Sequence, residues 1–378
     1  MLVYILTFLC SVFLFWLSQN VKQKQKRWVL LVALIIPCVI AGIRDVSIGV
    51  DVTSYASKIF ECACKSNSFG DYLDSTYEYN WTMVNVGSME LGYTLFVYII
   101  AKVFGNIAVL LFFTELIIIL PVIYGLRKEN GNTYLWLSMM IYYFMFYNNS
   151  LNVMRQSISA SLIFLAIQFL REERIKTSIA WVIVACFFHK SAFLGFICIF
   201  AYCYLKPSLK KDSNKLKQKT KRLLIIIAIG VFALMISNFF EPILVALGLE
   251  RYSLYVSGRI QFMPNQLITR LPVLFVIWYM RKELYKQGVN TLFFIAMVIL
   301  DIFAGQFASV SVYSVRIGMY FSIFSISALA QSCIAIDRRL STKRLVCFGI
   351  VIAYILSYWW YYFVFNNNGF TIPYVFAF

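Results

Sequence analysis

The chain has 378 residues, of which 61% are hydrophobic, 18% aromatic and only 13% charged, and its mean hydropathy is +0.76. A soluble domain has about 25% charged and 45–50% apolar residues, so water cannot be the solvent for most of this chain. The composition excludes a soluble enzyme, a secreted disulfide scaffold and a disordered chain, and it indicates a polytopic integral membrane protein.

The net charge of +17 is distributed in a way that argues against a nucleic-acid partner. Of the 34 Lys and Arg residues, 24 lie in six short runs between apolar stretches, at 22–27, 127–128, 171–176, 206–222, 281–286 and 338–344. Runs of this kind mark the cytoplasmic loops of membrane proteins. We therefore expect the lipid bilayer, and no nucleic acid, as a partner.

Apolar stretches predict spanning helices along the whole chain. The first begins at residue 2 without a basic region or a cleavage site, which favours a retained helix over a removed signal peptide. The others lie at about 28–43, 107–126, 133–148, 151–170, 178–189, 190–205, 223–240, 271–280, 289–304, 314–336 and 345–365. We predict an all-α polytopic membrane protein of about 12 transmembrane helices, organised as a single domain over 1–378.

Cytoplasmic basic runs place the remaining loops on the outer side. The larger extracytoplasmic loops are then 44–90 and 241–270, the 206–222 loop is a basic cytoplasmic loop, and both termini lie outside. The apolar stretch 91–104 either crosses, with one violation of the charge rule, or forms a re-entrant or interfacial helix. We favour re-entrance, because fourteen residues are short for a crossing.

Basic residues on the outer side need a reason other than topology. Arg155 and Arg316 each lie in an apolar helix near its outer end, where an ionised group is a functional candidate. Their alternative role is to reach lipid headgroups, and for Arg259 that role is equally favoured. Asp301, in the outer half of a span, is a candidate partner for Arg316.

Several acidic and proton-transferring side chains share this outer side. His189, the one histidine, lies at a turn between two apolar spans and can exchange a proton near neutral pH. Asp51 and Tyr55 are four residues apart and share a face if the stretch is helical. Asp51 and Glu90 have the simpler alternative of capping a helix N-terminus.

Motifs for nucleotide use and for metal binding are missing from the sequence. It contains no Walker A motif, no dinucleotide-binding glycine fingerprint and no DxD, and a single histidine allows no convincing metal cluster. We expect no cofactor and no metal, and any chemistry must then use a pre-activated substrate.

Five short motifs occur in a familiar order along the chain. They are R-D-x-S-I-G-x-D-x-x-x-Y at 44–55, E-L-G-Y at 90–93, N-x-x-R-Q-S-I-S-A at 152–160, F-F-H-K-S-A at 187–192 and I-P-Y at 372–374. In this order they resemble the EpsG-like family of bacterial surface-polysaccharide polymerases, which includes Wzy-type O-antigen and capsule repeat-unit polymerases.

The resemblance implies a glycosyltransferase of the bacterial inner (cytoplasmic) membrane with its active site facing the periplasm or outside. Its substrates would be undecaprenyl-pyrophosphate-linked oligosaccharides, and a chain-length regulator of the same pathway would be a partner. Catalytic roles would fall to His189, Asp51 and Arg155. Substrate binding would involve Arg44, Arg316, Glu90, Tyr93, Tyr55, Asn152, Gln156 and Arg259.

Three other functions compete with the polymerase. A flippase for lipid-linked oligosaccharides would use similar arginines but is typically built from two related halves, and no such repeat is evident. An O-antigen ligase would have the same chemistry and a different product. A channel or permease should carry charges in the middle of the membrane, whereas here they gather at the outer rim.

Overall fold

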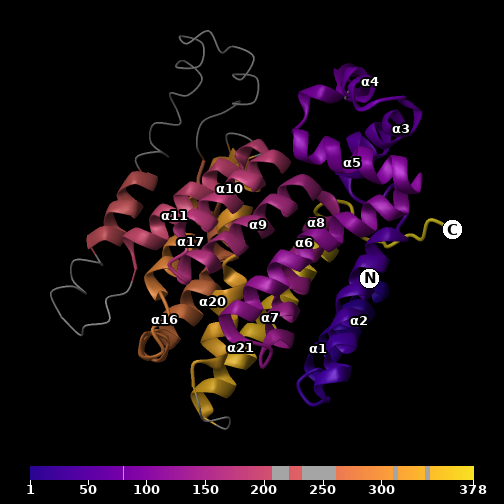
Figure 1. The fold of residues 1–378 in the computed structure, drawn as a ribbon. Coiled ribbons are helices and arrows are strands. Elements are labelled where there is room, and N and C mark those ends of the chain that lie inside the picture. The colour runs from indigo at the N-terminus through magenta and orange to yellow at the C-terminus, as the bar shows by residue number, and fades with distance from the viewer. Residues whose placement is uncertain (80, 207–220, 232–260, 310–313, 337–340) are drawn as a thin grey trace. The chain divides into compact units, whose positions relative to one another are not determined.

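The computed structural model describes residues 1–79, 81–206, 221–231, 261–309, 314–336 and 341–378. These residues form two compact units. Unit 1 consists of Met1–Phe193 and Ile355–Phe378, and unit 2 of Leu194–Tyr354. The fold is mostly helical (Figure 1), as predicted, with one short antiparallel hairpin that the sequence analysis did not foresee.

Unit 1 contains the N-terminal helices, an excursion that includes the hairpin, and a second group of helices. In chain order its elements are α1 (Leu2–Leu17), α2 (Gln23–Gly42), η1 (Val52–Ala56), α3 (Ser57–Lys65), α4 (Phe69–Asp74), β1 (Thr76–Tyr79), β2 (Thr82–Asn85), η2 (Val86–Ser88), α5 (Leu91–Phe104), α6 (Ile107–Asn130), α7 (Leu135–Tyr142), η3 (Tyr143–Tyr147), α8 (Asn148–Asn152), α9 (Met154–Arg171), α10 (Ile175–Phe188) and η6 (Trp360–Phe365). The single turn η4 (Lys190–Leu194) follows α10 and ends at the boundary with unit 2.

Unit 2 is helical in its described part. They are α11 (Gly195–Tyr204), α15 (Pro264–Ile268), α16 (Leu271–Lys286), α17 (Thr291–Gln306), η5 (Phe307–Ser309), α18 (Ser314–Ile317), α19 (Met319–Ser322), α20 (Ser325–Ile334) and most of α21 (Thr342–Trp359). The predicted 206–222 and 241–270 loops lie largely outside the described residues. Of the predicted 223–240 span, residues 223–231 are described and are helical, and the rest lies outside the described residues.

Four helices in the described part of the chain are long and apolar enough to cross a bilayer: Gln23–Gly42, Ile107–Glu129, Thr291–Ser309 and Thr342–Phe365. Five shorter apolar helices accompany them, at Leu2–Leu17, Leu91–Phe104, Ile175–Phe188, Lys190–Tyr204 and Met319–Ile334. The chain is therefore a mostly helical membrane protein, and the predicted count of about 12 crossings is not confirmed.

Helix α9 is the centre of unit 1. Every residue from Gln156 to Leu170 is buried, and the helix packs between α6 and α10. Beside it an aromatic cluster joins α1 to η3, where the Phe8 ring stacks on Tyr143 at 5.4 Å between centroids and meets Tyr147 edge to face. A helix this thoroughly buried is held rigidly, so a side chain at its end is well positioned.

The segment 43–106 of unit 1 leaves the helix bundle after α2 and returns to it at the same end, at the start of α6. A Cβ on Gly42, at the end of α2, would lie 2.9 Å from the carbonyl oxygen of Ala108 in the first turn of α6. At the other end of α6, the Lys128 amine binds Glu172 of the α9–α10 turn at 2.7 Å. The basic runs 22–27, 127–128 and 171–176 thus lie at the end of unit 1 opposite the 43–106 segment.

Helix α5 has two different faces. Tyr93, Val97 and Ala101 are buried on the side that packs against α3 and α4. The other side exposes an unbroken apolar stripe of Leu91, Leu95, Ile99 and Val103. The Lys102 amine donates to the carbonyls of Cys64 and Ser66 and ties the end of α5 to the end of α3.

Candidate functional site

Asp51 connects the loop after α2 to the start of α9. Val153 breaks the helical path between α8 and α9 with φ −103° and ψ 65°, which leaves the first amide groups of α9 without partners in their own helix. The Asp51 carboxylate accepts a hydrogen bond from one of them, the Met154 amide, at 3.2 Å. Asp51 also precedes η1, but its described hydrogen bonds do not cap that turn, so the expected N-cap has moved to another helix.

Tyr55 confirms the expectation that it shares a face with Asp51. Residues 52–56 form a π-helical turn, and the Tyr55 hydroxyl donates to Asp51 Oδ2 at 2.5 Å. Burial, and then the nearby Asp51 charge, raise the pKa of Tyr55 well above its ordinary value. Tyr55 therefore stays protonated and acts as a donor.

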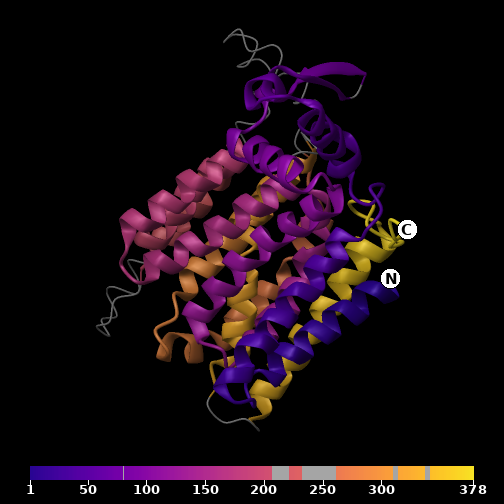
Figure 2. The same cartoon turned by 45° about the vertical axis from the view of Figure 1, so that its right-hand side comes forward.

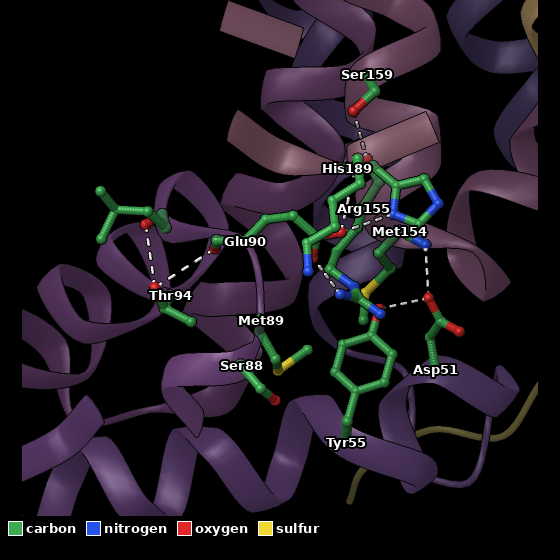
Figure 3. Close-up of polar contacts among 12 residues, drawn as sticks. Asp51, Tyr55, Ser88, Met89, Glu90, Thr94, Met154, Arg155, Ser159 and His189 are labelled. Atoms are coloured by element: carbon green, nitrogen blue, oxygen red, sulfur yellow. Dashed lines mark hydrogen bonds and ion pairs between the residues drawn. The ribbon is translucent and has the colours of Figure 1, made fainter. Parts of the chain in front are cut away.

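Three segments converge on the carboxylate of Glu90, which ends the extended stretch before α5 (Figure 3). Arg155 Nη1 donates to Glu90 Oε2 at 2.5 Å, and the Lys190 amide donates to Oε1 at 3.1 Å. His189 Nδ1 lies 3.3 Å from Oε1, without yet meeting the geometry of a hydrogen bond. Glu90 thus joins the N-terminus of α5 to that of α9 and to the turn after α10, and it is not a simple cap.

The guanidinium of Arg155 also packs on aromatic rings. Its central carbon lies 4.5 Å from the centre of the Tyr55 ring and 5.9 Å from that of Tyr93. The two rings meet edge to face. Contact with ring faces holds the planar guanidinium in one orientation. The side chains of Arg155 and His189 are still 21% and 28% exposed, so a ligand can reach both.

Glu90 is an anion in this arrangement. Burial by itself raises the pKa of the carboxyl, but His189, Arg155 and the Lys190 amide outweigh burial and lower the pKa to about 2. A carboxylate with so low a pKa is a weak general base at neutral pH. It is well suited to orient its two neighbours, which leaves His189 as the better proton acceptor.

Two buried polar atoms border this site. Arg155 Nε and the Tyr93 hydroxyl have no hydrogen-bond partner within the described part of the chain. Buried polar atoms without partners are uncommon in folded proteins. Tyr93 is fully buried, so it lies in the wall of the site and offers no open surface to a ligand. Its predicted part in substrate binding stays a prediction.

Arg44 lies behind the site. Its side chain is buried, and Nη2 donates to the Leu151 carbonyl at 3.1 Å and contacts Met154 Sδ at 3.7 Å. These contacts brace the break between α8 and α9. Arg44 is therefore a structural brace here, and its predicted part in substrate binding stays a prediction.

Asn152 and Gln156 are also turned toward protein. Asn152 Oδ1 accepts the Val50 amide at 2.8 Å, and its side chain packs against Gly369. Gln156 is 4% exposed within α9. Both side chains pack around the site, and their predicted contact with substrate stays a prediction.

The other two predicted arginines lie in other parts of the chain. Arg316 is exposed on α18 of unit 2, and Arg259 lies outside the described residues. The carboxylate of Asp301 is held by Arg270, whose Nε and Nη2 donate at 2.7 Å and 3.0 Å. Arg270 was not the expected partner, and this bidentate pair replaces the predicted one with Arg316.

One buried acid of unit 1, Glu115, was not among the predicted site residues. Glu115 of α6 accepts hydrogen bonds from Ser150 at 2.7 Å and from Tyr142 at 3.2 Å. A single acid in an otherwise apolar span was the available signal, since such groups are functional candidates by default. The described residues contain no group of three or more His, Cys, Asp or Glu side chains that could hold a metal ion.

Comparison with protein families covers nearly the whole chain. A family model described as the EpsG family matches residues 27–376. The chain belongs to the EpsG family. All five motifs of the sequence lie inside the matched stretch, and four of them supply the residues that meet around Arg155. No curated protein and no solved structure matches this EpsG-family chain.

Proposed function

We propose that this EpsG-family protein is a polysaccharide polymerase of the bacterial inner membrane. It joins undecaprenyl-pyrophosphate-linked oligosaccharide repeat units into O-antigen, capsule or exopolysaccharide at the outer face. Family membership supports a polymerase-type role. The observation that carries the proposal is the accessible Arg155, fixed by Glu90 and Tyr55 beside the one histidine of the chain.

Arg155 suits the pyrophosphate of the donor. A guanidinium matches phosphate oxygens in a planar, bidentate way and stays charged when partly desolvated. Only Nη1 is used by Glu90 in the described contacts, and the side chain reaches solvent. A cation that is already held in place stabilises negative charge as it develops on the leaving group.

His189 suits the acceptor hydroxyl. The approach of Nδ1 to Glu90 favours the tautomer with its proton on Nδ1, which leaves Nε2 to accept a proton. In the transfer step the acceptor hydroxyl gives its proton to Nε2, and its oxygen bonds to the anomeric carbon of the donor. The bond from that carbon to the pyrophosphate breaks, and the electron pair leaves on the pyrophosphate beside Arg155.

An apolar surface adjoins these groups. The exposed stripe of α5 begins at Leu91, the residue after Glu90, and Gly92 packs against the backbone of Phe187, whose side chain is half exposed. The polyprenyl chain of a lipid-linked donor needs such a surface next to the site that holds its pyrophosphate. This face also supports the interfacial interpretation of 91–104.

The test is to delete the gene in its own bacterium and to separate the surface glycan on a gel. We expect the ladder of long chains to collapse to the core with a single repeat unit and to return with the wild-type gene. Arg155→Ala and His189→Ala should fail to restore it, whereas Lys65→Ala, at a side chain 80% exposed on α3, should restore it.

Other gel patterns would assign other functions. Loss of all surface glycan, including the single-unit band, would indicate a flippase or a ligase and would contradict polymerisation. An unchanged ladder in the deletion strain would contradict a role in this polymer altogether.

A further inference from the structure

The C-terminal segment (residues 366–378) runs back over unit 1 after η6, beside the N-terminal helices (Figure 2). Thr371 is fully buried and anchors it. Its carbonyl accepts the Tyr4 hydroxyl at 2.7 Å, and its hydroxyl accepts Asn148 Nδ2 at 3.0 Å. The Tyr374 hydroxyl donates to the Ile40 carbonyl at 2.7 Å, near the end of α2.

The same segment pairs with the loop that follows α2. Arg44 and Phe376 form an antiparallel bridge, in which the Asp45 amide donates to Val375 at 2.9 Å and the Ala377 amide to Ile43 at 3.0 Å. At the far end of the loop, the Gly49 amide donates to the Phe370 carbonyl at 3.3 Å. The C-terminal segment therefore holds the loop at both ends.

The loop passes this restraint to the site. The Val50 amide binds Asn152, and the next residue, Asp51, binds the first amide of α9 and the Tyr55 hydroxyl. Gly369 touches Asn152 from the other side: a Cβ there would lie 2.8 Å from Asn152 Nδ2. A short path of contacts thus connects the C-terminal segment, through Asn152 and Asp51, to the Tyr55 ring that packs on Arg155.

We propose that the C-terminal segment is a positioning element, with Gly369 and Thr371 as its positioning residues, that holds Asp51 and Tyr55 in register with Arg155. The proposal rests on the proposed polymerase function for its effect on activity. It gives a task to the I-P-Y motif, because Tyr374 and the buried Thr371 flank Ile372 and Pro373. It also explains why Asn152 faces protein.

The first test is Gly369→Ala, with Gly131→Ala as its matched control. Both glycines have positive φ, +86° and +63°, so alanine strains the backbone at both. A Cβ at 369 collides with Asn152, whereas one at 131 has no described atom within 4 Å. In the deletion strain we expect Gly369→Ala to reduce long-chain glycan at least tenfold and Gly131→Ala to leave it within twofold of wild type.

Hydrogen exchange of the purified full-length protein in detergent supplies a readout that does not depend on activity. Gly369→Ala should speed exchange in the peptide that covers residues 44–52 and leave peptides from the buried middle of α9 unchanged, and Gly131→Ala should change neither. Equal exchange of 44–52 in wild type and Gly369→Ala would overturn the positioning proposal, whatever the glycan assay shows.

A double variant separates positioning from general damage. Asn152→Ala removes two of the three atoms that a Cβ at 369 would meet and leaves the Cβ of residue 152, so Gly369→Ala should cost less activity in that background than in wild type. Full additivity of the two losses would contradict the proposal. If exchange changes as expected but the deletion strain keeps its ladder, the proposed function fails and the positioning element stands.

Discussion

Glu90 serves three partners with two oxygens, and this sharing explains a low pKa in a buried carboxyl. Removing water from Glu90 favours the neutral acid, but the contacts from Arg155, His189 and the Lys190 amide exist only for the anion or are stronger with it. The carboxylate is therefore both a charge for Arg155 and a support for the imidazole. A carboxylate at position 90 therefore orients the side chains of both Arg155 and His189.

This role predicts how stability depends on pH. The pKa of Glu90 is lowered in the folded protein to about 2, so the carboxylate stabilises the fold above its unfolded pKa of about 4.3. That contribution is lost as the pH falls from there toward 2. Thermal unfolding in detergent should show wild type losing more stability between pH 5 and pH 3 than Glu90→Gln, which is already destabilised at pH 7. Glu61→Gln, at a side chain 70% exposed, should behave like wild type.

Arg155 offers a second prediction, about shape and not charge. Lysine keeps the positive charge but loses the planar group that bonds Glu90 and covers the Tyr55 ring. We expect Arg155→Lys to lower the rate of chain extension about tenfold or more, equivalent to at least about 1.4 kcal/mol of transition-state stabilisation. The measurement compares the rate of glycan chain growth in the deletion strain carrying Arg155→Lys with the rates in the same strain carrying the wild-type gene or no gene. If Arg155→Lys extends glycan chains at the wild-type rate, the planar, bidentate guanidinium of Arg155 is not needed for activity.

At the scale of elements, the start of α5 decides where Glu90 lies. A Cβ on Gly92 would approach the Phe187 carbonyl oxygen to 2.7 Å and the Phe187 Cβ to 2.9 Å. Gly92→Ala should therefore push α5 away from α10 and pull Glu90 from His189, with an expected loss of chain growth of about tenfold. Gly349→Ala, in a helical position with open space, is the control and should keep wild-type growth. Equal effects of the two variants would show that α5 and α10 do not need this close contact.

The sequence predicted most helices but not the connections that build the site. Apolar runs predicted α2, α6, α10 and α17 to within about five residues at each end, because a segment in lipid must be apolar and must satisfy its backbone hydrogen bonds as a helix. Asp51 and Tyr55 met as expected, because their spacing is local. The Glu90–Arg155 pair joins residues 65 positions apart. Such a contact depends on tertiary packing, so local sequence patterns do not predict it.

Other failures have the same cause. Arg316 was the predicted candidate partner of Asp301, whereas packing of α16 on α17 gives Asp301 the partner Arg270. Arg44 sits next to a predicted outer loop, yet tertiary contacts bury it. The hairpin of β1 and β2 has only four residues in each strand, too few for alternation of apolar and polar residues to stand out.

At the scale of the whole molecule, the direction of α9 decides on which side of the membrane the chemistry takes place. The helix has 18 residues and a length of about 27 Å, with Asp51 and Glu90 at its start and the 171–176 basic run at its end. The 43–106 segment lies at the end of unit 1 where α9 begins, and the basic runs of unit 1 lie at the end where α9 stops. Since basic runs stay in the cytoplasm, the site should face the outside.

Cysteine labelling tests this orientation. In a variant without the nine native cysteines, Lys65→Cys on α3 and Arg174→Cys after α9 each supply one exposed thiol, since the native side chains are 80% and 54% exposed. A thiol reagent that cannot cross the inner membrane should label residue 65 in intact cells and residue 174 only after the membrane is opened. Labelling of both positions in intact cells would place the two ends of α9 on one side, and the reverse pattern would put Arg155 in the cytoplasm. Helix α9 carries Arg155 near its start and leads into the 171–176 basic run at its end. Either result would therefore rule out a lipid-linked donor that Arg155 binds at the outer face.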